Sequence, residues 1–271
     1  MEDEPGVTLR RERGGLQGID RLVRIFEAVA AGPAPLSKIA SESGLSDATT
    51  LRYLGSLVSH GLLERDPDSR LYRMGMRMFL LGRSAIGGRD FMAVATSAMA
   101  QLVDQIDETV NFGARVGVDL VIVRVLESSQ PIRMGAAVGD KDRWHSSGLG
   151  KAILSTLPAE EIGTLLTEHG MAELTPRTLI TPEDLLRDLA RARTRGFATD
   201  DEESVEGLRC AAAPIRDARG TARYALSVSA PAYRLPHSRL LEVGEALRAQ
   251  AEVLEALLDH APAGPRADAA R

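Results

Sequence analysis

Apolar residues in the first third of the chain recur at the spacing of short amphipathic helices. One helix is expected over residues 18–31, a second over 36–43 and a third over about 47–60. Gly44 lies in the tight turn between the second and third helices, and Ser46 is a favourable N-cap for the third. Two short helices joined by a glycine-containing turn are typical of a helix-turn-helix.

A short β-hairpin is expected directly after the third helix. Residues 62–65 and 70–74 flank the turn Asp66-Pro67-Asp68-Ser69, and charged residues alternate with apolar ones. In this arrangement we expect Leu63 to lie opposite Leu71. A helix-turn-helix followed by a basic hairpin is a winged helix-turn-helix, so the pattern predicts a DNA-binding domain.

The third predicted helix has an apolar face and a polar face. A helical wheel directs Leu51, Leu54 and Val58 toward the core. The outward-facing residues are Thr49, Arg52, Tyr53 and Ser56. The exposed N-terminal half of a helix in the major groove reads base edges, and an arginine there can pair with guanine through two hydrogen bonds. The alternative is an ordinary solvated helix face.

Basic residues on the hairpin, among them Arg65, would contact phosphate and add affinity without reading sequence. The full set of residues that we predict to contact DNA is Lys38, Thr49, Thr50, Arg52, Tyr53, Ser56, Arg70 and Arg73.

The pattern changes near residue 88, where a second domain is expected to begin. An apolar connecting helix is predicted over residues 74–86, followed by a flexible joint at Gly87-Gly88. Beyond it we expect helices over 91–110, 146–156, 181–195 and 235–260, and strands over 111–116, 120–126, 132–138, 208–215 and 223–229. The predicted divisions are a disordered arm (1–15), the winged domain (16–75), a linker helix (76–88), a larger mixed domain (89–260) and a disordered tail (261–271).

Two features of the larger domain suggest a binding site for a small ligand. Gly148 and Gly150 open a predicted helix, where free backbone N–H groups favour an anion, although glycine at these positions could simply ease helix packing. The spacing of a nucleotide-binding P-loop is missing. In the last strand, Ser227 and Ser229 share one face, which either binds a polar ligand or is exposed to water.

The run Asp200-Asp201-Glu202-Glu203 and the single cysteine, Cys210, are weaker candidates for chemistry. Four adjacent acids point in different directions and usually form a solvated run, so we expect no metal site. Cys210 would need a base, and His145 has no evident third group to orient it. A lone cysteine on an apolar strand is usually a small core residue.

Composition and charge fit this organisation. Hydrophobic residues make up 44% and charged residues 26%, as in water-soluble globular proteins, and no apolar run approaches the roughly 18 residues of a membrane span. One cysteine excludes an internal disulfide, and we expect a cytoplasmic protein. The net charge is -5, but residues 10–83 have a net charge of +4, which is compatible with DNA binding.

Several motifs, in this order and spacing, resemble the IclR family of bacterial transcriptional regulators, and the resemblance covers about residues 16–258. The matching segments are 36–40 with Gly44-Leu45, Ala48-Thr49-Thr50-Leu51-Arg52-Tyr53-Leu54, His145-Ser146-Ser147-Gly148-Leu149-Gly150-Lys151-Ala152, 195–203, Gly207-Leu208-Arg209-Cys210-Ala211-Ala212 and Ser227-Val228-Ser229.

This resemblance implies an α+β chain of two domains: a winged helix-turn-helix joined by a linker helix to an α/β effector-binding domain of profilin- or GAF-like type. It also implies a homodimer or homotetramer. The effector site that it implies falls on Gly148, Leu149, Asp200, Cys210, Ser227 and Ser229. Two positions depart from the pattern: Leu149 is bulkier than the alanine often found there, and Ala48 replaces a common serine.

We therefore expect a ligand-responsive regulator of catabolic genes that binds double-stranded operator DNA and senses a small organic acid, more often as a repressor than as an activator. No cofactor and no membrane partner are expected. The alternative is an enzyme that acts on a small carboxylic acid and is carried on a winged domain.

Overall fold

A computed structural model describes residues 17–82 and 88–259 of the chain. The chain divides into two compact units, one before and one after the Gly88/Arg89 bond. The predicted arm (1–15), the predicted tail (261–271) and Gly87 of the predicted joint lie outside the described residues. Within the described residues no helix combines the length and the apolarity needed to cross a bilayer.

The described part of the N-terminal unit, residues 17–82, contains four helices and a hairpin. In chain order they are α1 (Gln17–Ala30), α2 (Leu36–Ser43), α3 (Asp47–Ser59), β1 (Leu63–Arg65), β2 (Tyr72–Met74) and α4 (Met76–Gly82). Gly44 ends α2 with a left-handed φ of 68°, and the Ser46 hydroxyl accepts the Thr49 N–H at the start of α3. These are the turn and the cap expected from the sequence, and they fix the angle between the two helices.

Two details of this unit differ from the sequence prediction. The buried stripe of α3 is Thr50, Leu54 and Leu57, whereas Leu51 is 50% exposed, because the core contacts the helix one position away from the predicted face. In the hairpin, Leu63 pairs with Met74 and not with Leu71. The loop extends to Leu71, whose carbonyl accepts the Asp66 N–H, so the strands are shorter than predicted.

The second unit is built around one antiparallel sheet of order β5-β4-β3-β8-β7-β6. The strands are β3 (Thr109–Val116), β4 (Asp119–Leu126), β5 (Lys141–Asp142), β6 (Ala198–Asp201), β7 (Leu208–Arg216) and β8 (Ala222–Pro231). The helices are α5 (Gly88–Ile106), α6 (Gly148–Leu154), α7 (Ala159–His169), α8 (Pro182–Arg195) and α9 (His237–Asp259).

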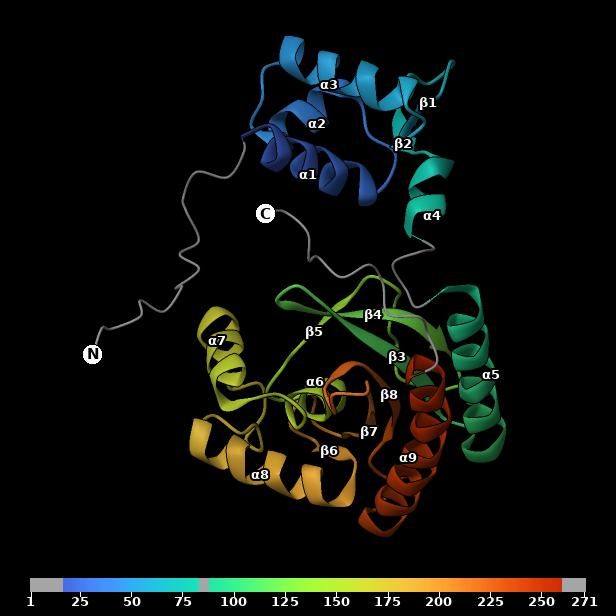
Figure 1. Cartoon of the computed structure of the whole chain (residues 1–271), viewed down its shortest axis with the longest axis vertical. Helices are drawn as coiled ribbons and strands as arrows, with labels where there is room; N and C mark the ends of the chain where they lie inside the picture. Colours follow the sequence, from blue (N-terminus) through green and yellow to red (C-terminus); the bar gives the residue numbers. More distant parts are fainter. Residues whose placement is uncertain (1–16, 83–87, 260–271) are drawn as a thin grey trace, which may run out of the picture. The chain divides into compact units, whose positions relative to one another are not determined.

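Helices cover both faces of the sheet, with α5 and α9 on one side and α6, α7 and α8 on the other (Figure 1). On the first side Phe91 of α5 packs against Phe112 and Tyr224 of the sheet. On the second side the side chains of α6 and α8 form a core with Ala212 and Ala225. Strands buried on both faces explain why β7 and β8 are almost entirely buried.

Sequence patterns gave the wrong structure in three places. Residues 132–138 form an irregular loop and not a strand: Gly135 interrupts the segment, and the backbone hydrogen bonds to Ile122 of β4 come from Gly139 and Asp140, which follow it. Helix α5 ends at Ile106, since Asp107 takes a positive φ and Val110 already lies in β3. Helix α7 and strands β5 and β6 were not predicted.

Candidate functional site

The outward face of α3 forms one side of a surface concavity in the N-terminal unit. Thr49, Arg52, Tyr53 and Ser56 line it together with Arg21 of α1, and its volume is about 360 Å³. Arg52 and Ser56 are exposed, while the Tyr53 ring packs partly against the core. The structure therefore gathers four predicted DNA-contacting residues on one surface and adds Arg21, which the helical wheel of a single helix could not reveal.

Thr50, which was also predicted to contact DNA, is fully buried. Its hydroxyl donates to the carbonyl of Ser46 at 3.0 Å, as a threonine in the first turn of a helix commonly does. No part of its side chain is accessible to a DNA atom, so Thr50 is removed from the set of candidate contacts. It belongs to the core stripe of α3.

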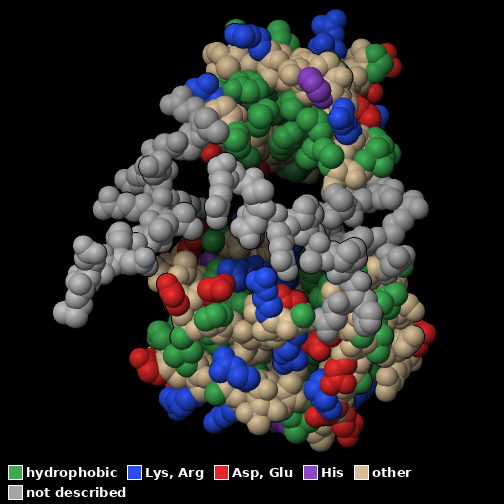
Figure 2. Space-filling view, in the orientation of Figure 1, with side chains coloured by type: hydrophobic (Ala, Val, Ile, Leu, Met, Phe, Trp, Pro, Cys, Tyr) green, Lys and Arg blue, Asp and Glu red, His purple; other side chains and the backbone are tan. Residues whose placement is uncertain are grey.

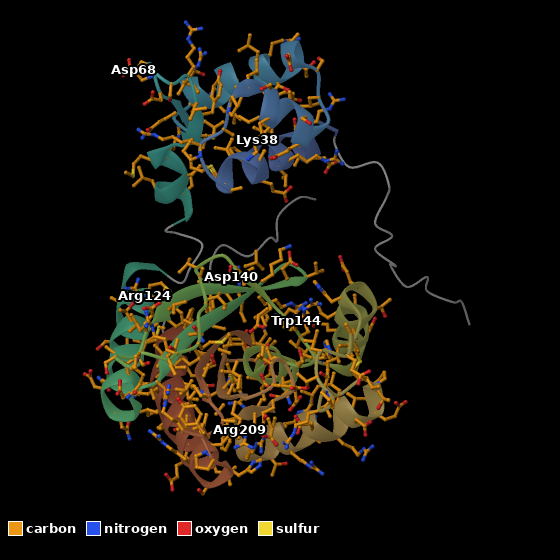
Figure 3. All side chains as sticks on the ribbon, turned by 180° about the vertical axis from the view of Figure 1, so that it is seen from behind. Lys38, Asp68, Arg124, Asp140, Trp144 and Arg209 are labelled. Carbon is orange, nitrogen blue, oxygen red and sulfur yellow. The ribbon has the colours of Figure 1, made fainter. Side chains whose placement is uncertain are left out.

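The remaining basic candidates lie on other elements of the unit. Lys38 is an exposed residue of α2, placed apart from the tip of the hairpin that Asp68 marks (Figure 3), and its ammonium lies 3.8 Å from the Glu42 carboxylate. Arg70 is exposed in the hairpin loop with a positive φ of 58°. Arg73 donates twice to Glu64 on the neighbouring strand, at 2.8 and 3.0 Å, so part of its charge is neutralised locally.

The second unit contains a cavity of about 150 Å³ between the sheet, the start of α6 and the loop before β5. An engineered cavity of that size binds benzene, so the space suits a ligand of similar size. Its polar lining residues are Asn111, Asp140, Lys141, Asp142, Ser147, Asp200, Ser204, Cys210, Ser227 and Ser229. Asp140 lies near the β4–β5 edge of the sheet, at the end of the irregular loop (Figure 3).

Strand register explains why these polar residues meet. Across neighbouring strands, Asp200 pairs with Cys210 and Cys210 with Ser229. Two residues further along the strands, Ser227 pairs with Asn111. Paired residues share a face, so all five point to the same side of the sheet as α6. The serines are 2% and 3% exposed, which excludes the alternative that their face of β8 is simply open to water.

Glycines at the start of α6 bring its backbone close to this polar face. A side chain at Gly150 would clash with the carbonyl oxygens of Arg143 and Trp144, and one at Gly148 would lie 3.1 Å from Cβ of Cys210. Close packing is therefore a requirement at both positions. The first amides of α6, those of Gly148 and Leu149, have no acceptor inside the helix, and both residues line the same cavity as Ser227 and Ser229.

Leu149 lines the cavity and fits against a glycine on the sheet. Its Cδ1 lies 3.0 Å from the point where a Cβ of Gly113 would be. Leu149 is 2% exposed and belongs to the core beneath α6. The bulk of Leu149 is therefore partly accommodated by Gly113 and does not fill the cavity.

Asp200 terminates the polar row and organises the turn that follows β6. Its carboxylate accepts the N–H groups of Glu203 at 2.7 Å and of Ser204 at 3.3 Å, and also the Ser204 hydroxyl. Asp200 is fully buried, and burial raises its pKa to about 6. Desolvation likewise raises the pKa of Asp142 on the opposite wall. The composition of the acidic run suggested a solvated segment, but its first residue is buried in the cavity wall.

A buried lysine also stabilises the turn that follows β6. The Lys151 ammonium is fully buried and donates to both carboxylate oxygens of Glu203 at 2.6 Å and to Asp188 of α8 at 2.9 Å. Thr175 and Thr178 donate to the carbonyls of Glu202 and Glu203, each at 2.7 Å. The turn that presents Asp200 and Ser204 to the cavity is therefore fixed from several sides.

The groups needed for nucleophilic catalysis are not brought together. Burial raises the pKa of the Cys210 thiol well above its ordinary value, so the reactive thiolate is disfavoured. His145 is directed instead to the carbonyl of Ala172, at 3.0 Å. Within the described residues no cluster of His, Cys, Asp and Glu is arranged to hold a metal ion.

Comparison with known proteins decides the family. The family model described as "IclR helix-turn-helix domain" matches residues 18–67, and the one described as "Bacterial transcriptional regulator IclR C-terminal" matches residues 83–256. The chain belongs to the IclR family of bacterial transcriptional regulators. The predicted family and its two-domain architecture, a winged helix-turn-helix and an α/β domain, are confirmed.

Full-length relatives agree with this assignment. The acetate operon repressor of Salmonella typhimurium is 33% identical over 245 residues, 89% of each chain. The repressor AllR of Escherichia coli K12 is 33% identical over 246 residues, 90% of this chain and 91% of its own. These relatives are transcriptional regulators, so this IclR-family chain is a DNA-binding regulator, and the alternative of an enzyme on a winged domain is wrong.

Solved IclR-family structures match nearly the whole chain. The Thermotoga maritima IclR structure gives a TM-score of 0.68 at 26% identity, covering 89% of this chain and 100% of that one. An IclR homologue from Microbacterium hydrocarbonoxydans in complex with 4-hydroxybenzoate gives 0.76 at 25% identity, covering 89% and 98%. The IclR-family effector domain implies a small-molecule ligand for the second unit of this chain.

Sequence inspection missed several residues of the cavity and its support, chiefly Asn111, Asp142, Lys151 and Ser204. Asn111 left one usable signal, because an asparagine is unfavourable in the middle of an otherwise apolar strand. Lys151 left none, since its partner Glu203 is 52 residues away along the chain.

Proposed function

We propose that this IclR-family regulator is a repressor that senses a small organic acid and releases its operator when the acid binds. We assign DNA binding to residues 16–75, linkage to residues 76–88, and effector binding and oligomerisation to residues 89–260. Because its partner is DNA, we place its action in the cytoplasm. The single observation that carries the proposal is the buried polar cavity beside α6, whose size suits a small acid.

Within that cavity, Ser227, Ser229 and the first amides of α6 are the proposed donors to the carboxylate of the ligand. Gly148, Leu149, Asp200 and Cys210 complete the proposed site. The printed names of the relatives support the choice of direction and ligand: one is an acetate operon repressor, and one solved homologue is complexed with 4-hydroxybenzoate.

We propose Arg52 as the residue that reads a base, Thr49, Tyr53, Ser56 and Lys38 as positioning contacts, and Arg70 and Arg73 as phosphate contacts. Exposed apolar residues on α1 and α4 support a homodimer formed through the N-terminal units. They are Ile19, Val23, Met76, Leu80 and Leu81, and Figure 2 shows hydrophobic side chains gathered on the visible face of that unit. A tetramer formed through the second units remains part of the proposal.

DNA binding is tested with an operator selected from a random-sequence pool by the purified protein. Arg52→Ala should weaken binding by about fivefold or more and relax preference at one base pair, as loss of a bidentate contact does. Arg70→Ala should weaken binding to all DNA sequences alike and reduce the salt dependence of that binding. Arg187→Ala, an exposed arginine of α8, is the matched control. Unchanged affinity of Arg52→Ala at moderate salt would remove Arg52 from the proposal.

The ligand is sought by thermal denaturation of the full-length protein with glyoxylate, pyruvate and aromatic carboxylates. A ligand at about 100 times its Kd should add about 2.7 kcal/mol to the free energy of unfolding. The effect should vanish in the Ser227→Ala, Ser229→Ala double variant, and the ligand should release the selected operator. If no carboxylate stabilises the protein, the organic-acid ligand is excluded, while the DNA-binding assignment stands.

A further inference from the structure

The wall of the cavity contains a buried hydrogen-bond acceptor that has no partner among the residues that the structure describes. Asn111 of β3 is 3% exposed and lines the cavity. Its amide nitrogen donates to the Ser229 hydroxyl at 3.4 Å, but its Oδ1 has no hydrogen-bond partner. Such an atom costs free energy unless a ligand or a water molecule donates to it.

The Asn111 amide is placed with its nitrogen on Ser229, which leaves its oxygen toward the cavity. The Ser229 oxygen is 2.7 Å from the Cys210 sulfur and accepts from Asn111 on its other side. If the amide were reversed, its nitrogen would point to the cavity and its oxygen to Ser229. With its oxygen toward the cavity, Asn111 can accept a hydrogen bond from the ligand. With its nitrogen there, it would donate one instead.

The ionisable groups of the wall are also mostly acceptors. Asp140, Asp142 and Asp200 line the cavity with a single cation, Lys141, whose ammonium is 2.9 Å from Asp119. A ligand with only acceptor atoms would therefore place an oxygen against the Asn111 carbonyl and close to carboxylates. A ligand with a hydroxyl or amide N–H would satisfy the orphaned oxygen.

We propose that Asn111 selects effectors that carry a hydrogen-bond donor next to their carboxylate-binding end, namely hydroxy acids or amide-bearing acids, over oxo acids of the same size. This inference rests on the proposed function and names the chemical class of its ligand. The Ser227 hydroxyl donates to the carboxylate, and Asn111 Oδ1 accepts the ligand's O–H or N–H. Sites that hydrogen-bond a ligand hydroxyl discriminate strongly against analogues that lack it.

The test compares matched acids with the full-length protein by isothermal titration calorimetry at pH 8. The pairs are lactate with pyruvate, glycolate with glyoxylate, and mandelate with benzoylformate. In at least one pair, the acid with the donor should bind about tenfold or more tightly. In the Asn111→Leu variant the preference should disappear, whereas Asn111→Asp, which keeps an acceptor at that place, should retain it while binding both acids more weakly.

Three results have distinct meanings. Binding in which the oxo acid is preferred overturns the role of Asn111 and leaves the organic-acid ligand intact. A donor preference that survives in Asn111→Leu also overturns it. If no acid of any pair binds the wild type or the variants, the proposed organic-acid function fails, and with it this inference.

Discussion

Asp200 gives the cavity a buried acid whose protonation should affect stability. Its pKa is raised from 3.8 to about 6, because desolvation outweighs the hydrogen bonds from Glu203 and Ser204 that favour the charged form. The folded protein therefore holds this proton more tightly than the unfolded chain does. This contribution to stability is complete below about pH 4 and is lost as the pH rises through about 6.

The Asp200→Asn variant isolates this effect, because it keeps an oxygen that can accept from Glu203 and has no proton to lose. Between pH 4 and pH 7.5, the free energy of unfolding of the wild type should fall relative to the variant by roughly 1 to 3 kcal/mol, measured by urea denaturation. The control is Asp66→Asn: hydrogen bonds from Ser69 lower the pKa of Asp66 below its ordinary value, so Asp66 titrates below this pH range and its difference from wild type should stay nearly constant. A difference between wild type and Asp200→Asn that does not vary with pH would contradict the prediction.

At the same scale, the sequence indicated only those site residues whose chemistry is visible locally. Ser227 and Ser229 could be predicted because their shared face follows from the alternation within one strand. Asn111 joins them through strand register, which the sequence does not encode locally, and Asp200 was assigned to the site only through the resemblance to the IclR family. Thr50 was misassigned because a helical wheel gives relative directions on a helix but not which direction meets the core.

At the scale of elements, the packing of α6 on β3 depends on the match between Leu149 and Gly113. A Cβ at position 113 would lie 3.0 and 3.3 Å from the two methyl groups of Leu149, so Gly113→Ala should force Leu149 to shift and cost about 1 kcal/mol. In a Leu149→Ala background the clash is absent, and Gly113→Ala should be neutral or stabilising. The two substitutions should therefore couple in a double-mutant cycle.

Urea denaturation of the four proteins measures this coupling. Gly163→Ala, an exposed glycine of α7 with open space around it, is the matched control and should have the same effect in both backgrounds. Additive effects of Gly113→Ala and Leu149→Ala on the free energy of unfolding would show that the two residues are not energetically coupled. Leu149→Ala should also enlarge the cavity and favour bulkier acids, which calorimetry with benzoate derivatives would detect.

Elements marked by strong local signals were predicted well, and elements defined by pairing were not. Ser46, Thr181 and Gly196 mark helix ends through caps and a left-handed residue, and the structure contains all three. Residues 132–138 look apolar enough for a strand, but no neighbouring strand pairs with most of them. Strand β6 is four residues long and acidic, and it exists because β7 lies beside it.

At the scale of the whole molecule, the proposed repressor must couple its two units energetically. If an acid in the cavity weakens operator binding by some factor, the operator must weaken binding of the acid by the same factor. Such coupling typically amounts to 5- to 150-fold. We therefore expect the acid to bind the free protein more tightly than the protein–operator complex, with equal factors measured from either side.

Calorimetric titration of the acid into free protein and into the complex gives one factor, and fluorescence anisotropy of labelled operator with and without saturating acid gives the other. Arg52→Ala should weaken operator binding both with and without the acid and leave the ratio of the two affinities unchanged, because Arg52 acts on DNA alone. The Ser227→Ala, Ser229→Ala double variant should show no effect of the acid on operator binding, because it no longer binds the acid. A stronger complex in the presence of acid would make the protein one whose ligand promotes DNA binding, and equal affinities would mean that the cavity does not regulate the winged unit.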